Sequence, residues 1–262
     1  MTAQLVVGAG EVGKALAEVL GIDVLDVHTA EEDSREVEIL HIAFPWSEPS
    51  EAEKVTWDHG PVLEVRQDGF VNEVRRYADI HQATIVVVHS TVPVETCDPE
   101  GWIHSPIRGR HPHLAEGIRT FEKPVAGYND IDVALVRSVF ASAGIETVAY
   151  PNARTSELGK LLELAQYGVE IRMQKEAYAL ARLHDVDPEL AYYDMGLRYN
   201  RGWAQLYSPR FVKPVLAEVP GPIGGHCVAQ NTPLLENDFF NEAVLPLAPE
   251  NWDSSEEAQG LV

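Results

Sequence analysis

The sequence predicts an α/β fold: a doubly wound parallel sheet, followed by a smaller helical domain built on one long helix. Short β-branched runs alternate with helical stretches through the first half, which is the order typical of a parallel sheet covered by helices. The strand pattern then stops, and apolar residues recur at every third or fourth position. The expected domains are residues 1–152 for the sheet, 153–248 for the helices and 249–262 for an acidic, flexible tail.

The strands of the first domain follow in order along the chain. QLVVGAG is the first strand, and the helical stretch EVGKALAEVLG after it ends at Gly21. IDVLDVH is the second strand. The runs at 37–46 and 84–93 are almost entirely apolar, as in strands buried on both faces. Residues 68–82 have helical spacing, and WIHSP, KPVAGY and IETVAY are shorter candidate strands.

The stretch from Thr155 to His184 predicts one helix of about 30 residues, well above the ~11–12 of a typical helix. Thr155 or Ser156 is expected to cap its start. A helix of this length commonly spans a domain junction or a dimer interface, so we expect a homodimer formed through it. A further helix, DPELAYYDMGLRYN, is expected to begin near Asp187.

Composition excludes several classes of protein. The formal net charge is −21, which argues against a nucleic-acid partner because phosphates would be repelled. We interpret this charge as a solvated acidic surface or as adaptation to a salty habitat. No apolar run approaches the ~18–20 residues of a membrane span, and the N-terminus lacks the basic region of a signal peptide. The only two cysteines, Cys97 and Cys227, match neither a disulfide framework nor zinc spacing. We expect a cytoplasmic protein without a metal.

The segment GAGEVG (8–13) matches the G-x-G-x-x-G pattern between a strand and a helix, and it predicts a Rossmann-type site for NAD. Gly8 permits the tight turn, Gly10 lets the backbone approach a pyrophosphate, and Gly13 lets helix and strand pack closely. The helix N-terminus supplies unpaired N–H groups for the phosphates. A fold that binds S-adenosylmethionine, or that has lost its ligand, is the alternative.

Asp26 ends the second strand, where its carboxylate can accept hydrogen bonds from the ribose hydroxyls. This favours NAD over NADP, because the carboxylate would repel the extra phosphate. Asp23 is the less favoured candidate for the same role. The expected cofactor-binding set is completed by Glu11, Val12, Pro45 and Ser90.

Three later segments carry a resemblance to one family. HSTVPVET (89–96) resembles a strand-and-turn STVPPGT, and TSELGKLLELAQ (155–166) resembles a helix A-E-L-x-K-x-x-x-N. GPIGGHCVAQN (221–231) resembles G-x-G-x-G-G-H/S-C-x-x-x-D. The three motifs that these segments resemble are those of the nucleotide-sugar dehydrogenases, the UDP-glucose and GDP-mannose 6-dehydrogenase family. Only 35 residues follow Cys227, so we expect a shortened, divergent member without the family's C-terminal nucleotide-sugar-binding domain.

The resemblance implies NAD-dependent oxidation of a sugar C6 alcohol, with a cysteine that traps the intermediate aldehyde. Cys227 would be that nucleophile, because a thiolate is intrinsically reactive. Lys160 would stabilise oxyanion charge, and Thr91 would help to place water or substrate. Gly224 and Gly225 would let the backbone approach the substrate closely.

The sequence also departs from the family pattern. Leu164 stands where the family has an asparagine, and Asn231 stands where it has an aspartate. Ile107 or Pro112 takes the place of the family's glutamate, depending on the alignment. The asparagine, aspartate and glutamate that are replaced here belong to the hydrolytic half-reaction of the family. A two-electron oxidation, or the reverse reduction, is therefore expected in place of full oxidation to an acid.

The segment SPIRGRHPHL (105–114) is the densest positive stretch of this acidic chain. It follows a strand, at the edge where doubly wound sheets bind ligands, and arginine suits carboxylate or phosphate. We expect it to recognise an anionic group of the substrate. A loop whose arginines pair with surface acids is the alternative. The expected substrate-binding set is Arg108, Arg110, His111, His113, Gly224, Gly225 and His226.

Two histidines of this segment, His111 and His113, are also candidates for a general acid or base. His226 would tune the thiol of Cys227 or serve as a turn residue. The expected function is an NAD-dependent oxidoreductase that acts on an alcohol or aldehyde of a small anionic substrate, with nucleotide sugars as candidates. The alternative is a Rossmann protein that is not a dehydrogenase: an S-adenosylmethionine-dependent methyltransferase or an NAD-binding regulatory protein.

Overall fold

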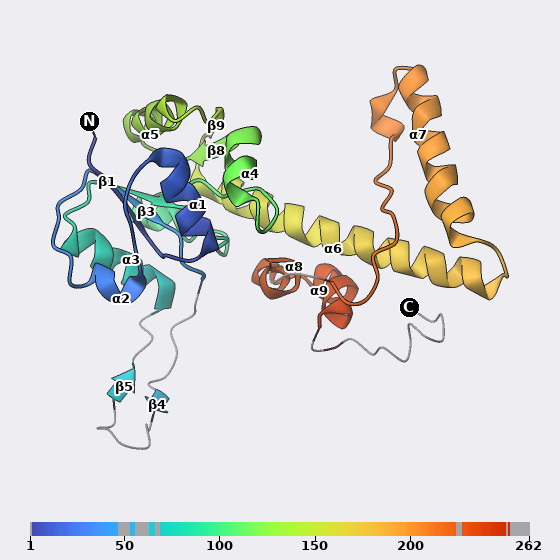
Figure 1. Cartoon of the computed structure of the whole chain (residues 1–262), viewed down its shortest axis with the longest axis horizontal. Helices are drawn as coiled ribbons and strands as arrows, with labels where there is room; N and C mark the ends of the chain where they lie inside the picture. Colours follow the sequence, from blue (N-terminus) through green and yellow to red (C-terminus); the bar gives the residue numbers. More distant parts are fainter. Residues whose placement is uncertain are drawn as a thin grey trace. The chain divides into compact units, whose positions relative to one another are not determined.

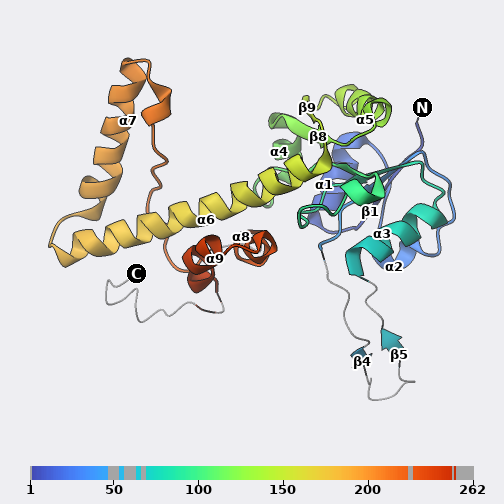
Figure 2. The ribbon, with the colours of Figure 1, turned by 180° about the vertical axis from the view of Figure 1, so that it is seen from behind.

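The computed structural model describes residues 2–46, 53–55, 63–65, 69–223, 227–249 and 251 (Figures 1 and 2). The chain divides into two compact units, Met1–Lys160 and Leu161–Val262. The division falls inside the long helix α6 (Ala153–Leu183). No helix in these ranges has both the length and the apolar character that crossing a membrane requires. Gly224, Gly225 and His226 lie outside the described residues, as does most of the expected acidic tail.

The first unit is built on a seven-stranded sheet with the order β2-β1-β3-β6-β7-β8-β9. Its strands are β1 (Gln4–Val7), β2 (Val24–Leu25), β3 (Ile39–Ile42), β6 (Ile85–Val88), β7 (Ile103–His104), β8 (Lys123–Ala126) and β9 (Thr147–Tyr150). The first five strands in chain order are parallel, whereas β8 and β9 run the opposite way because β7 and β8 pair antiparallel. The predicted doubly wound sheet is confirmed. The reversed direction of β8 and β9 was not predicted from the sequence. A separate antiparallel pair joins β4 (Glu53–Val55) and β5 (Leu63–Val65).

Helices cover both faces of this sheet (Figures 1 and 2). They are α1 (Glu11–Leu20), α2 (Val27–Ala30), α3 (Gly69–Ile80), α4 (Leu114–Thr120) and α5 (Asp130–Ser142). Successive strand residues point to opposite faces, so each strand contributes to two cores. On β1, Leu5 and Val7 pack with the α3 side, whereas Val6 packs with α1, α4 and α5. The apolar runs of the sequence therefore correspond to strands buried on both faces.

The sheet changes winding direction at β1. The chain leaves β1 for β2 on one side and then crosses to β3 on the other. In open α/β sheets such a point opens a crevice at the carboxyl ends of the strands, where ligands bind. Gly8 follows β1 at this edge, and a Cβ on it would lie 2.7 Å from the carbonyl carbon of Ala43, just after β3. The glycine loop therefore sits at the switch point.

The second unit contains the remainder of α6, together with α7 (Met195–Gln205), α8 (Cys227–Asn231) and α9 (Asp238–Val244). A π-helical turn (Glu189–Asp194) precedes α7, and the Asp187 carboxylate accepts from the N–H of Glu189 at 2.9 Å, as expected for a cap. The segment before GPIGGHC is held along α6, because Lys175 and Gln174 bond the carbonyl and the N–H of Val219. The predicted helical region and its long helix are confirmed.

The start of α6 differs from the expectation. The helix begins at Ala153, and Asn152 caps it by accepting from the N–H and the hydroxyl of Thr155 at 2.9 and 2.7 Å. The Asp98 carboxylate accepts from the N–H of Ala153 at 2.8 Å. Thr155 and Ser156 are thus inside the first turns rather than at the cap. An earlier asparagine and a distant aspartate already satisfy the exposed N–H groups.

Candidate functional site

The glycine loop has the geometry that its pattern predicts. Gly8 has φ +112°, which favours glycine, and a Cβ on Gly13 would lie 1.8 Å from the carbonyl oxygen of Gly8. Both positions therefore require glycine for the turn and the packing. A Cβ on Gly10 would meet no atom within 4 Å, so the start of α1 opens onto space. That space adjoins the N–H groups of the first turn, where a diphosphate would fit.

Asp26 lies just after β2 rather than at its end, since β2 ends at Leu25. It is exposed, and its carboxylate accepts from the N–H of His28 at 3.1 Å as the cap of α2. The alternative, Asp23, is in an ion pair with Arg35. Asp26 therefore keeps its place as the candidate for the ribose hydroxyls, at the same edge as the glycine loop.

The remaining cofactor candidates gather at the ends of β3 and β6. The hydroxyl of Ser90 donates to the carbonyl of Phe44 at 2.5 Å, which ties these two strand ends together. Pro45 is exposed and Thr91 is half-buried beside them. Glu11 and Val12 form the first turn of α1. These residues, from three separate segments, lie at one edge of the sheet.

His104 is a buried residue at this edge that sequence reasoning missed. Its Nε2 lies 3.1 Å from the carbonyl oxygen of Ser90, and its Nδ1 lies 2.8 Å from the hydroxyl of Ser156. A carbonyl can only accept, so Nε2 carries the proton and Nδ1 accepts from Ser156. Burial lowers the pKa of His104 to about 3. A neutral histidine therefore links the start of α6 to the candidate cofactor edge.

Glu157 is a second missed residue, although it lies inside the helix segment that carries the resemblance. Its buried carboxylate accepts from the N–H groups of Glu95 and Cys97, each at 2.8 Å. Burial raises the pKa of this carboxyl group. Glu157 thereby holds the turn that follows Thr91. Cys97, to which no role was assigned, is buried in that turn.

Two lysines bind three successive carbonyls of the loop after β7. Lys160 donates to Ile107 at 3.0 Å, and Lys123 donates to Ser105 at 2.6 Å and to Pro106 at 3.0 Å. Lys123 is buried, and burial holds its pKa well below the usual range, with the charges of Lys160 and Arg108 as further causes. Sequence reasoning missed Lys123. One of the two positions that replace the family's glutamate, Ile107, thus contacts Lys160 through its backbone.

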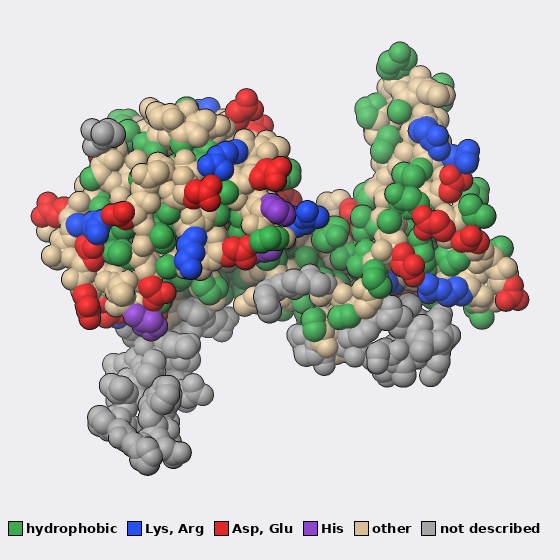
Figure 3. Space-filling view, in the orientation of Figure 1, with side chains coloured by type: hydrophobic (Ala, Val, Ile, Leu, Met, Phe, Trp, Pro, Cys, Tyr) green, Lys and Arg blue, Asp and Glu red, His purple; other side chains and the backbone are tan. Residues whose placement is uncertain are grey.

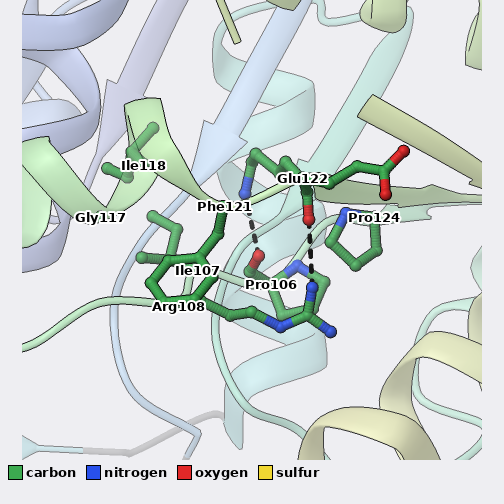
Figure 4. A pocket seen from close by; sticks show the side chains of 9 residues that line it. Pro106, Ile107, Arg108, Gly117, Ile118, Phe121, Glu122 and Pro124 are labelled. Carbon is green, nitrogen blue, oxygen red and sulfur yellow. Dashed lines mark hydrogen bonds between the residues drawn. The ribbon is translucent and has the colours of Figure 1, made fainter. Parts of the chain in front are cut away.

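Arg108 lies half-buried at the end of this loop and donates to the carbonyl of Glu122 at 3.1 Å (Figure 4). The small cavity beside it, lined also by Phe121 and Lys123, has a volume of about 10 Å³. That is the space of about one water molecule, too little for a substrate. Arg110, His111 and His113 are exposed, and Nδ1 of His111 lies 2.6 Å from a carboxylate oxygen of Glu11.

Cys227 belongs to the second unit, where it is exposed and opens α8. The side-chain amide of Asn231 donates to the carbonyl of Cys227 at 2.8 Å. Ile223 is fully buried, and its N–H donates to the carbonyl of Leu247 at 2.8 Å. The described residues hold no group of three or more His, Cys, Asp or Glu side chains placed to bind a metal ion.

Comparisons with known proteins bear on the fold. No family model and no curated protein matches the chain. Among solved structures, UDP-D-ManNAc dehydrogenase of Pyrococcus horikoshii matches with a TM-score of 0.65 and 16% identity, over 90% of this chain and 64% of that one. UDP-N-acetylmannosamine dehydrogenase Cap5O of Staphylococcus aureus matches with a TM-score of 0.61 and 18% identity, over 98% and 68%.

A shorter protein also matches: 3-hydroxyisobutyrate dehydrogenase of Mycobacterium tuberculosis has a TM-score of 0.57 and 15% identity, over 89% of this chain and 85% of that one. The chain thus spans 64% of the Pyrococcus enzyme and most of the mycobacterial one. The resemblance predicted from the sequence is confirmed at the level of the fold.

Proposed function

We propose that this protein is an NAD-dependent oxidoreductase that interconverts an alcohol and an aldehyde on a small anionic substrate, with nucleotide sugars as the first candidates. The observation that carries the proposal is the glycine loop. Gly8 and Gly13 admit no side chain, whereas Gly10 opens onto space at the N-terminus of α1. This arrangement fits a dinucleotide at the switch point of the sheet. The dehydrogenases that share the fold support the same class of chemistry.

Each candidate residue has a proposed role in this reaction. When bound, the nicotinamide accepts or supplies the hydride. Lys160 would hold the substrate oxygen as charge develops on it, and its contact with Ile107 already directs its amine to the loop after β7. Thr91 would position the substrate or water, and Arg108 and Arg110 would bind the anionic group. The thiol of Cys227 would add reversibly to the aldehyde to form a thiohemiacetal, with the thiol proton passing to the aldehyde oxygen.

The chemistry is expected to stop at two electrons. Hydrolysis of a cysteine-bound intermediate would need a base, and an amide at position 231 cannot serve as one. The side chain of Asn231 instead bonds the Cys227 backbone. The departures from the family's motifs, such as Asn231 in place of an aspartate, also favour a second candidate function. This is a Rossmann protein that binds NAD or S-adenosylmethionine without acting as a dehydrogenase.

We also propose that the protein forms a homodimer through its helical unit. Large hydrophobic side chains are exposed there, and Figure 3 shows some of them on the surface of α7 among charged ones. The more exposed ones on α6 and around α7 are Met173, Leu180, Leu183, Leu190, Met195, Leu206 and Tyr207. Exposed apolar side chains in this number point to an interaction surface. A second copy supplies the same surface and so completes an isologous interface.

The test of the cofactor is thermal unfolding of the purified protein with NAD, NADH, NADP or S-adenosylmethionine at saturating concentration. A ligand that binds the native state at ~100 times its dissociation constant adds about 2.7 kcal/mol of stability. Stabilisation by NAD or NADH, and less by NADP, is the expected result. It would be followed by a screen of anionic alcohols and nucleotide sugars for NADH formation. Stabilisation by S-adenosylmethionine alone, or by none of the four, would contradict the proposal.

A further inference from the structure

The basic segment 108–113 reaches the glycine loop at one point. Nδ1 of His111 lies 2.6 Å from a carboxylate oxygen of Glu11, the first residue of α1. Farther along, Arg119 of α4 pairs with Glu18 of α1 at 3.4 Å. The segment and the helix that follows it are therefore both held against α1, the helix whose N-terminus would receive the phosphates.

Glu11 can serve a dinucleotide through its backbone N–H at the start of α1, but its side chain is an unfavourable neighbour for the diphosphate. An acidic side chain in the first turn stabilises a helix, because it faces the positive end of the helix dipole. The diphosphate of a bound dinucleotide would lie at the same end and carry the same sign of charge. The two groups repel each other, most strongly at low ionic strength. The Glu11 side chain is about half exposed, so its charge also faces solvent.

His111 is the side chain that contacts this carboxylate. Its Nδ1 donates to the Glu11 carboxylate, and the exposed Arg110 precedes it in the chain. We propose that His111 is a positioning residue for the cofactor: it holds the Glu11 carboxylate and so favours a dinucleotide diphosphate at the N-terminus of α1. This inference rests on the proposed function. It assigns His111 to the cofactor rather than to the anionic group of the substrate.

The test measures binding of NADH to the full-length protein by fluorescence titration, for the wild type, His111→Ala, Glu11→Gln and the double variant. We expect His111→Ala to weaken NADH binding about two- to fivefold, the size of one exposed charge–charge interaction, because the released Glu11 carboxylate then acts on the diphosphate. The loss should be largest at about 0.01 M salt and vanish near 1 M, where the Debye length is only about 3 Å. Adding Glu11→Gln to His111→Ala should restore binding, and adenosine, which has no phosphate, should bind all four proteins equally.

His184→Ala is the matched control, since His184 is an exposed histidine just after α6. It should bind NADH as the wild type does. Glu11→Gln keeps the backbone N–H at position 11 and removes only the carboxylate charge, so it should bind NADH at least as tightly as the wild type. This variant tests the inference even if circular dichroism shows that His111→Ala is poorly folded. Unchanged NADH binding in His111→Ala, equal losses for adenosine and NADH, or no recovery in the double variant would overturn the assignment alone. A wild type that binds no dinucleotide would overturn the proposed function with it.

Discussion

The two units of the protein differ in how they use buried and exposed side chains. In the first unit, two apolar clusters seal both faces of the sheet, and only four large hydrophobic side chains among the described residues are exposed. Among the described residues of the second unit, one cluster of five buried residues forms the core, and fifteen large hydrophobic side chains are exposed. The first unit thus buries most of its large hydrophobic side chains, whereas the second exposes many of them, and on these the proposed dimer depends.

Polar groups distinguish the first unit further. Its sheet encloses a hydrogen-bonded series in which His41 Nδ1 lies 3.0 Å from His89 Nε2, and His89 Nδ1 lies 2.6 Å from the carbonyl of Ser105. Because that carbonyl accepts, His89 carries its proton on Nδ1, and His41 must donate from Nδ1. Burial lowers the pKa of both rings and so keeps them neutral. A neutral His41 must then accept at Nε2, so the side-chain amide of Gln4, which lies 3.1 Å away, presents its NH₂ group there. The buried histidines of the first unit are therefore a source of pH sensitivity, whereas no histidine is buried among the described residues of the second unit.

The largest expected effect is a loss of stability in acid. Burial lowers the pKa of His41 and of His104 to about 3, and that of His89 well below its usual value. The unfolded chain binds protons at these sites below about pH 6.5, so stability falls as the pH is lowered from there towards the folded pKa values. The slope is about 1.4 kcal/mol per pH unit for each histidine. Urea unfolding at pH 7, 6 and 5 measures it.

A matched variant makes this prediction specific. His41→Gln should reduce the slope by about one histidine's share, or about 1.4 kcal/mol per pH unit. A free energy of unfolding that stays level between pH 7 and pH 5 would show that the buried histidines are accessible to protons. In that case the contrast between the two units would not extend to pH.

The second largest effect separates stability from binding within the glycine loop. Gly13→Ala should lower the free energy of unfolding by about 2–4 kcal/mol, because its Cβ would overlap a backbone oxygen. Gly10→Ala should change it by less than about 1 kcal/mol, since nothing lies within 4 Å of the added carbon. It should nevertheless weaken NADH binding strongly. Chemical unfolding measures the stability of the two variants, and NADH titration measures their affinity for the dinucleotide. A Gly10→Ala protein with normal NADH affinity would mean that the dinucleotide binds elsewhere.

The third prediction concerns the exposed surface of the second unit. Sedimentation should show a dimer for the wild type, and Leu180→Glu with Leu183→Glu should raise the dimer dissociation constant by more than about tenfold. Ile131→Glu is the matched control, because Ile131 is as exposed as Leu183 (79% and 76%) but lies on α5 of the first unit. It should leave the dimer intact. Equal weakening by both changes would remove the distinction between the two surfaces.

The smallest expected effect tests the turn held by Glu157. Glu157→Gln keeps one acceptor oxygen and loses the other, so one of the N–H groups of Glu95 and Cys97 loses its bond. The expected cost is about 1 kcal/mol in the free energy of unfolding. Glu242→Gln, on the exposed face of α9, should cost less than about 0.5 kcal/mol. A cost no greater than that of the control would mean that the turn keeps its conformation without the carboxylate.

Much of the candidate cofactor edge could be predicted from the sequence. The three glycines signal their own backbone requirements, and the apolar runs of β3 and β6 indicate buried strands. The roles of His104, Lys123 and Glu157 could not be predicted. Each of these side chains bonds a residue at least 18 positions away, such as Ser156, Ser105 or Cys97. The spacing of residues within a short stretch of sequence cannot indicate a contact over such a distance along the chain.

The sequence by itself determined the order of strands and helices, the long helix α6 and the glycine turn. These features depend on periodicity and on steric limits within a few neighbouring residues. Only the tertiary structure decided that β8 and β9 run against the other strands, that Asn152 caps α6, and that His111 meets Glu11. Such outcomes depend on which distant segments pack together, and packing is a property of the folded chain as a whole.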